Sequence, residues 1–160
     1  MNKFTDFGLK PEILDAIDAK GFEEPSEIQS KAIPLILGSE GHVVGKAQTG
    51  TGKTAAFGLP VLNLINSDVK QLQALVVVPT RELAIQVTEE INSLSGRLPV
   101  LAASVYGGQS YSEQIKHFRR GDQIIVGTPG RLVDHIQNGK LDLSEAEAVA
   151  SVIHSLSLAG

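Results

Sequence analysis

The sequence contains no cysteine, which excludes disulfides, thiol catalysis and cysteine-based zinc sites. It also lacks a long apolar segment, since runs such as ALVVVP at 74–79 are far too short to span a bilayer. The N-terminal MNKFTDFGLK has neither an extended apolar core nor a small-residue cleavage site, so it does not fit a secretory signal. We therefore expect a cytoplasmic protein with no membrane partner.

Excess positive charge is absent as well. The formal net charge is -4 and the pI is about 5.5, so the chain as a whole gives no indication of nucleic-acid binding. Any such site must be a local patch or use backbone amides. The 160 residues predict one domain with a sizeable core, and they contain no internal repeat or low-complexity linker.

Helical and strand-like apolar patterns alternate along the chain. The predicted helices are 11–20, 26–37, 53–65, 81–94, 111–120 and 131–139, and the predicted strands are 42–47, 74–79, 100–108 and 123–127. This alternation predicts an α/β fold with a mainly parallel sheet and helices on both faces. The turns AQTGTGKT, PTREL, GGQ and GTPGR follow the strands, so they fall at the carboxyl ends, where such sheets bind ligands.

The segment AQTGTGKT (47–54) has the form of a phosphate-binding loop, G-x-x-x-x-G-K-T, with Ala47 in place of the first glycine. Its glycines allow backbone N–H groups to turn toward phosphate oxygens, and the following helix adds a positive N-terminal end. Lys53 would reach the β and γ phosphates, and Thr54 would ligate Mg²⁺. The alternative is a flexible loop before a helix, but the strand–loop–helix context favours nucleotide binding. The predicted phosphate-binding residues are Ala47, Gln48, Thr49, Gly50, Thr51, Gly52, Lys53 and Thr54.

Five segments, in order along the chain, resemble motifs of the DEAD-box RNA helicases. They are Gly21-Phe22-x-x-Pro25-Ser26-x-Ile28-Gln29 with Phe4 upstream (Q motif), AQTGTGKT (motif I), PTRELAIQ at 79–86 (motif Ia), Tyr106-Gly107-Gly108 (GG motif) and TPGR at 128–131 (motif Ib). The resemblance covers about residues 1–143 and implies the N-terminal RecA-like nucleotide-binding lobe of a bacterial-type ATP-dependent RNA helicase. Residues 144–160 are then a divergent tail.

The Q-motif resemblance implies selectivity for an adenine nucleotide, ATP or ADP with Mg²⁺. The amide of Gln29 has one acceptor and one donor group that can meet an adenine edge, and the ring of Phe22 can stack on a base. Without the phosphate-binding loop, a core phenylalanine and a solvated glutamine would be the simpler interpretation. With that loop present, we expect both residues to bind nucleotide.

The other three motifs imply contact with the backbone of single-stranded RNA. The candidate residues are Pro79, Thr80, Arg81, Glu82, Gly107, Gly108, Gln109, Thr128, Pro129, Gly130 and Arg131. Hydroxyls, backbone amides and arginines suit phosphate and ribose contacts, which do not read bases. Ordinary turns and helix caps are the alternative for each segment.

The histidines and the basic cluster receive simpler interpretations. His117, Arg119 and Arg120 are expected at a solvated helix end. The remaining histidines, His42, His135 and His154, have no metal-ligand spacing, so we expect them to be structural or exposed.

The resemblance ends where the helicases carry Asp-Glu-Ala-Asp. LDLSE (141–145) is present, but the family's spacing then places the four positions on Val152-Ile153-His154-Ser155, and no acid follows Glu147. Glu145 and Glu147 precede that strand and are poor replacements. The Ser-Ala-Thr motif and the second RecA-like lobe, a partner for this one, are also missing, so no catalytic residue is assigned. VASVI (149–153) could still complete the sheet as a buried strand, or the tail could be foreign to the family.

We therefore predict an adenine-nucleotide-binding lobe that contacts RNA weakly and, as an isolated chain, neither hydrolyses ATP nor unwinds RNA. Two alternatives stay open: a non-catalytic module that binds RNA or a protein partner, and a small P-loop kinase. The kinase would need an acceptor-site base and an arginine-rich lid, which the sequence does not offer.

Overall fold

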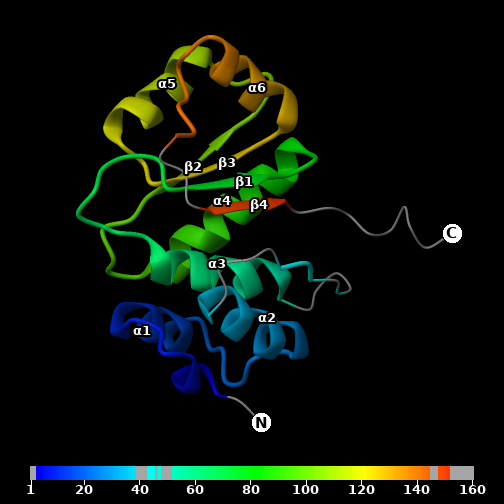
Figure 1. The fold of residues 1–160 in the computed structure, drawn as a ribbon, viewed down its shortest axis with the longest axis vertical. Coiled ribbons are helices and arrows are strands. Elements are labelled where there is room, and N and C mark those ends of the chain that lie inside the picture. The colour runs from blue at the N-terminus through cyan, green and yellow to red at the C-terminus, as the bar shows by residue number, and fades with distance from the viewer. Residues whose placement is uncertain (1–2, 39–42, 46, 48–51, 145–147, 152–160) are drawn as a thin grey trace, which may run out of the picture.

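A four-stranded parallel sheet forms the centre of the computed structural model, which describes residues 3–38, 43–45, 47, 52–144 and 148–151. The strands are β1 (Ala74–Val77), β2 (Ala102–Val105), β3 (Ile124–Gly127) and β4 (Ala148–Ser151). Their order across the sheet is β2-β3-β1-β4 (Figure 1). Ala74 pairs with both Ile124 and Ala148, and Ala102 pairs with Ile124, so the carboxyl ends of all four strands meet at one edge.

Helices cover both faces of this sheet, as the alternating pattern predicts. They are the 3-10 helix η1 (Phe4–Phe7), α1 (Pro11–Ala19), α2 (Glu27–Gly38), α3 (Lys53–Leu64), α4 (Arg81–Ser95), α5 (Tyr111–Arg120) and α6 (Pro129–Gln137). Figure 1 shows α5 and α6 on one side of the sheet and α3 and α4 on the other, with α1 and α2 outside α3 and α4. The predicted α/β fold class is therefore confirmed.

The continuously apolar strands explain this layering, because alternate side chains of a strand point to opposite faces. Val76, Ile124 and Val126 belong to the larger core, which also contains side chains of α1, α3 and α4. Leu75 and Ile125 belong to the smaller core on the other face, with Leu132 of α6 among its members. The sheet thus fixes the positions of two separate helical layers relative to the strand ends.

One predicted strand is wrong. Residues 43–45 and 47, the described part of the segment 42–47, lie outside any strand. A strand needs a neighbour for its backbone groups, and β4 pairs only with β1 within the described residues. Val44 is 95% exposed, so this short apolar run buries too little surface to hold an extended segment in place.

The tail contributes a strand to the sheet. Ala148–Ser151 forms β4, which runs parallel to β1 with Val77 opposite Ser151. The four positions where the helicases have their acidic motif, 152–155, lie outside the described residues, as do Glu145 and Glu147.

Candidate functional site

The first candidate site begins at the start of α3. Gly52 is the N-cap residue of this helix, and its φ of 81° is a left-handed conformation that glycine adopts without strain. Lys53 and Thr54, the predicted phosphate and magnesium ligands, are the first two residues of the helix. Both are partly exposed at the positive end of the helix dipole. Ala47 is described beside them, whereas Gln48, Thr49, Gly50 and Thr51 lie outside the described residues.

Gln29 joins α2 to this helix start. Its side chain is only 5% exposed. The Nε2 amide donates to the carbonyl of Gly52 at 3.2 Å, across 23 positions of the chain. A Cβ atom at position 52 would collide with the Gln29 amide, so the glycine is needed both for its backbone angle and for this close approach. The structure therefore brings two predicted nucleotide-binding segments, the Q motif and motif I, into direct contact.

The other end of the Gln29 amide caps its own helix. The backbone N–H of Ser26 donates to Gln29 Oε1 at 2.9 Å, and the backbone N–H of Gln29 donates to Ser26 Oγ at 3.4 Å. This reciprocal pair is a capping box, which satisfies amides at the start of α2. Both polar ends of the side chain are thus bonded within the protein. Each end uses one of its two bonding positions here, which leaves one Nε2 hydrogen and one Oε1 lone pair for an adenine edge.

Phe22 lies at the edge of the larger core. Its ring stacks on Phe4 with centroids 6.4 Å apart, and the ammonium of Lys20 lies 5.6 Å from the ring centre. Phe4 is buried, so the upstream residue of the Q motif supports the ring of Phe22. The stacking of Phe22 on a base stays a prediction.

The residues of this site fit a nucleotide better than a metal ion alone. Gly52 and the N-terminus of α3 offer backbone amides to phosphate oxygens, the arrangement by which helix starts bind anions. For Mg²⁺, the hydroxyl of Thr54 is a single oxygen ligand. Nowhere in the described ranges do three or more metal-binding side chains gather. Phosphate oxygens and water would have to complete the coordination shell.

The second candidate site lies at the carboxyl ends of β1, β2 and β3. These strands are neighbours, so the segments that follow them, 79–82, 106–109 and 128–131, gather at one edge of the sheet. Two backbone bonds hold the strand ends together: Val78 N–H donates to Gly127 O at 3.0 Å, and Thr128 N–H donates to Val105 O at 3.1 Å. The structure thus brings together the three segments predicted to contact RNA.

Thr80 caps the helix that follows it, whereas Thr128 does not. The Thr80 hydroxyl accepts a bond from Leu83 N–H at 3.2 Å and caps α4, which is the simpler interpretation of that residue. Thr128 occupies the same position before α6, but its side chain makes no capping bond. Pro79, Thr80, Arg81 and Glu82 are exposed, as are Gly107 and Gly108. Because Thr128 makes no capping bond, the segment 128–130 presents a hydroxyl that is not used in capping.

Aromatic rings hold the two arginines of this site. The Arg81 guanidinium lies 5.4 Å from the ring centre of Tyr106, and that of Arg131 lies 5.6 Å from the ring centre of Tyr111. Contacts of this kind contribute modestly at exposed positions. They connect motif Ia with the GG motif and α6 with α5, so both positive charges lie near the gathered loops.

Sequence reasoning missed two residues behind these loops. Gln114 of α5 and His135 of α6 are both fully buried, and His135 Nε2 lies 2.6 Å from Gln114 Oε1. Gln114 Nε2 donates to Tyr106 O at 2.9 Å and to Gln109 Oε1 at 2.6 Å. His135 was expected only to be structural or exposed, and it is structural. Polar residues on the apolar face of an amphipathic helix are the signal that could have identified this pair.

The buried imidazole of His135 is held in its neutral form. Burial lowers the pKa of His135 below its ordinary value, a nearby Arg131 lowers it further, and Asp134 opposes them. Its Nδ1 atom is buried and has no hydrogen-bond partner among the described residues. Because both burial and Arg131 disfavour the charged form, the imidazole is held neutral.

The basic cluster at the end of α5 is not simply a solvated helix end. Asp122 is 2% exposed and accepts two bonds from the guanidinium of Arg120, at 2.7 and 2.8 Å. His117 Nδ1 lies 3.3 Å from the same carboxylate. A buried carboxylate requires such pairing, so Arg120 holds the C-terminal end of α5 to the turn that precedes β3. Arg119 stays exposed, as expected.

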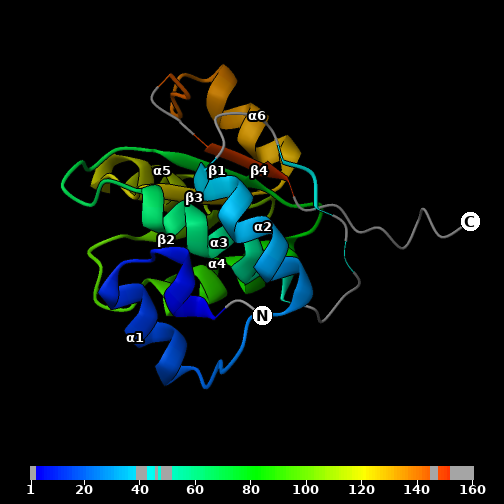
Figure 2. The same cartoon turned by 60° about the horizontal axis from the view of Figure 1, so that its bottom comes forward.

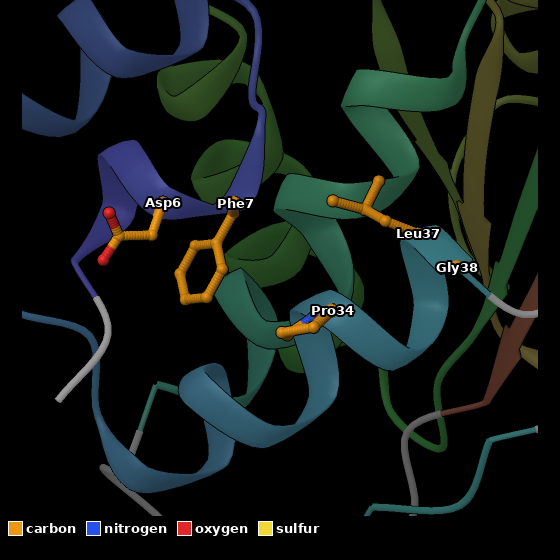
Figure 3. Close-up of a pocket in the computed structure, with 5 residues that line it drawn as sticks. All are labelled: Asp6, Phe7, Pro34, Leu37 and Gly38. Atoms are coloured by element: carbon orange, nitrogen blue, oxygen red, sulfur yellow. The ribbon is translucent and has the colours of Figure 1, made fainter.

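A hollow of about 430 Å³ lies apart from both candidate sites (Figure 3). Asp6 and Phe7 line it from η1, and Pro34, Leu37 and Gly38 line it from α2. None of these residues belongs to the predicted site. Within the described residues, no helix is both long and apolar enough to cross a membrane.

Comparison with known proteins bears on the motif resemblance. The family model of the DEAD/DEAH box helicases matches residues 26–153. The chain is 49% identical over 150 residues to the ATP-dependent RNA helicase CshA of Listeria monocytogenes, covering 93% of this chain and 28% of that relative. It is 50% identical over 143 residues to the ATP-dependent RNA helicase DeaD of Escherichia coli K12, covering 89% of this chain and 23% of that relative. The chain thus spans less than a third of the length of these relatives.

Solved structures agree. A DEAD box protein from the hyperthermophile Methanococcus jannaschii has a TM-score of 0.89 and 44% identity, over 93% of this chain and 40% of that chain. Dbp5 of S. cerevisiae, bound to RNA and ADP BeF3, has a TM-score of 0.81 and 32% identity, over 94% of this chain and 38% of that chain. The RecA-like fold and the family resemblance predicted from the motifs are both confirmed.

Proposed function

The chain belongs to the DEAD/DEAH box helicase family, and on that premise we propose that it is an adenine-nucleotide-binding helicase lobe. It binds ATP or ADP with Mg²⁺ at the junction of α2 and α3 and contacts the backbone of single-stranded RNA weakly. As an isolated chain it neither hydrolyses ATP nor unwinds RNA. A cytoplasmic location and a second RecA-like lobe as partner belong to the same proposal.

The observation that carries the nucleotide proposal is the bond from Gln29 Nε2 to Gly52 O, 3.2 Å long. It places a buried amide with matched donor and acceptor groups at the start of the helix that carries Lys53 and Thr54. In this arrangement Gly52 and the α3 N-terminus bind phosphate, Lys53 neutralises its charge, and Gln29 and Phe22 select adenine. Mg²⁺, when bound, neutralises phosphate charge and is ligated by Thr54.

The proposed lack of hydrolysis has a chemical reason. Attack by water on the γ-phosphate needs a carboxylate that helps to hold Mg²⁺ and a group that orients the water. The chain has no acid after Glu147, in the region where the family carries its acidic motif. Bound nucleotide is therefore expected to persist unhydrolysed on this chain.

The RNA proposal rests on the edge formed by 79–82, 106–109 and 128–131. This edge presents Arg81, Arg131, exposed glycine amides and the uncapped start of α6, which suit phosphate and ribose groups. The net charge of -4 limits the electrostatic contribution to affinity, so binding by this chain alone is weak and sensitive to salt.

A thermal melt of the purified chain with Mg²⁺ and ADP, GDP or no nucleotide tests the nucleotide proposal. A ligand that binds only the folded state raises the melting temperature. We expect ADP to raise it and GDP not to. Equal shifts with both would refute selection by Gln29, and no shift with either would refute the site.

One observation favours the non-catalytic RNA-binding module as a second candidate. The Gln29 side chain is only 5% exposed, whereas the three loops of the RNA edge are assembled on the sheet and include exposed residues. Under this alternative, RNA affinity does not depend on nucleotide. Measuring RNA binding with and without ADP separates the two candidates.

A further inference from the structure

Two fully buried polar side chains lie behind the loop Tyr106–Gln109. Gln114 comes from α5 and His135 from α6, and both are 0% exposed. Figure 1 shows that these two helices cover the same face of the sheet. Burying two polar side chains costs free energy unless they are bonded, so the pair requires a reason beyond filling space.

The hydrogen bonds fix the proton positions. The carbonyl of Tyr106 can only accept, so the nitrogen of the Gln114 amide must be the atom that lies 2.9 Å from it. Gln114 Oε1 then lies 2.6 Å from His135 Nε2, which must donate. His135 is therefore the neutral tautomer with hydrogen on Nε2, and its buried Nδ1 carries a lone pair without a partner.

We propose that Gln114 and His135 form a positioning relay that holds the loop Tyr106–Gln109 in place for RNA and works only while His135 is neutral. The proposal deepens the proposed function, since it rests on the RNA contacts of this loop. Neither residue touches RNA. Gln114 acts through the Tyr106 carbonyl and the Gln109 side chain, and His135 orients the Gln114 amide.

The loop needs such support because it has little of its own. Gly107 and Gly108 are exposed, and a Cβ atom at either position would meet no atom within 4 Å, so the space a side chain would occupy is open. Glycine backbones also lose more conformational freedom on ordering than other residues. The two bonds from the Gln114 amide fix the residues on either side of this glycine pair.

A second proton on His135 would disturb the relay. It would place an N–H at Nδ1, where none of the described residues offers an acceptor, and a charge against the rings of Tyr111 and Phe118. The charged and titratable groups around the imidazole are Arg131 and Asp134 on its own helix, the Tyr111 phenol on α5, and Lys140, whose backbone amide bonds to His135 O. Arg131 lowers the pKa of His135 and Asp134 raises it, so burial decides that the pKa is lowered overall.

The first test removes the relay with Gln114→Leu and uses Gln137→Leu, an exposed residue at the far end of α6, as the matched control. Hydrogen exchange of the amides at 107–109 reports loop position without RNA, and fluorescence anisotropy with labelled oligouridine reports binding. We expect Gln114→Leu to speed exchange and weaken binding about fivefold to tenfold. Unchanged exchange in a variant that still melts cooperatively would overturn the relay.

The second test uses His135→Gln, which keeps an amide donor near the position of Nε2 but does not titrate. Wild type should lose RNA affinity from pH 7.5 to 5.5 beyond any loss in His135→Gln, while the two bind equally at pH 7.5. His117→Gln, which removes the partly exposed imidazole beside Asp122, should keep the wild-type pH profile. An unchanged pH profile in His135→Gln would overturn the requirement for neutral His135.

The two tests also distinguish failure of this inference from failure of the proposed RNA binding. If wild type binds no oligouridine at any pH, the RNA proposal fails, and loop exchange at pH 7.5 and 5.5 alone decides the relay. If wild type binds and the variants change neither binding nor exchange, the relay fails while the RNA proposal stands.

Discussion

The two candidate sites are supported in different ways. At the nucleotide site, one amide, Gln29, connects α2 to α3, and both of its ends are already bonded. At the RNA edge, three adjacent strands fix the loops, and a buried pair on two helices holds one of them from behind. The first candidate site therefore depends on one buried side chain that joins two helices, whereas the second is held by the sheet itself. Figure 2 shows that α2 and α3 lie on the opposite side of the sheet from α6.

Gly127→Val should have the largest effect on stability, because it adds a side chain to the closely packed edge of the sheet. A Cβ at this position would lie 2.7 Å from atoms of both Leu132 and Val105, so the added side chain cannot fit between β3, β2 and α6. We expect the free energy of unfolding in urea to fall by about 2 kcal/mol. Gly130→Ala, where the Cβ meets open space, is the matched control and should not destabilise. Equal stability of the two variants would contradict the close packing at this edge.

Gly52→Ala should have a smaller effect on stability and a selective effect on function. The new Cβ meets the Gln29 amide, and the φ of 81° is unfavourable for alanine. We expect about 1 kcal/mol of destabilisation, loss of the ADP-dependent rise in melting temperature, and unchanged RNA binding. Gly38→Ala, in open space at the end of α2, serves as the control. Loss of RNA binding in Gly52→Ala would contradict the independence of the two sites.

Gln29→Ala removes the capping box and the bond to Gly52 together. Loss of a cap and of one neutral hydrogen bond predicts destabilisation of about 1 kcal/mol. The variant should also lose the preference for ADP over GDP, which thermal melts measure. Lys31→Gln breaks only an exposed pair on the same helix and should leave both properties unchanged. Retained ADP selectivity in Gln29→Ala would refute the role of this amide.

The last prediction concerns the dependence of stability on pH. The folded-state pKa of His135 is lowered, so the unfolded chain binds more protons below the ordinary value of 6.5. Unfolding free energy therefore falls as pH drops below about 6.5, by at most about 1.4 kcal/mol per pH unit for one proton. Urea unfolding at several pH values should show a shallower dependence in His135→Gln than in wild type. Identical slopes would show that His135 does not titrate differently in the folded state.

The sequence predicted the sheet and most helices because continuous apolar runs and helical spacing report burial directly. ALVVVP and QIIVG became β1 and β3, and the motif-bearing turns after them lie at the carboxyl edge as expected. The run at 42–47 failed because local β propensity does not supply a pairing partner. Strand formation there depends on long-range contacts that a short window does not contain.

Site residues were harder to predict than elements. The motif resemblance pointed to Gln29, but only the structure reveals that its amide serves as a cap and as a bridge to Gly52. Gln114 and His135 lie 21 positions apart, and neither carries a motif, so their contact depends on how α5 packs against α6. Asp122 follows Arg120 by only two positions, but charge alone does not show that its carboxylate is buried and needs the guanidinium as a partner.

The most direct test of the nucleotide site is a ¹H–¹⁵N NMR titration of the chain with ADP and Mg²⁺, following the side-chain amide of Gln29 and the backbone amide of Gly52. The account predicts that both signals shift together and saturate with ADP, and that GDP at the same concentrations shifts neither. A Gln29 amide that stays unchanged while ADP binds would contradict adenine recognition at the junction of α2 and α3.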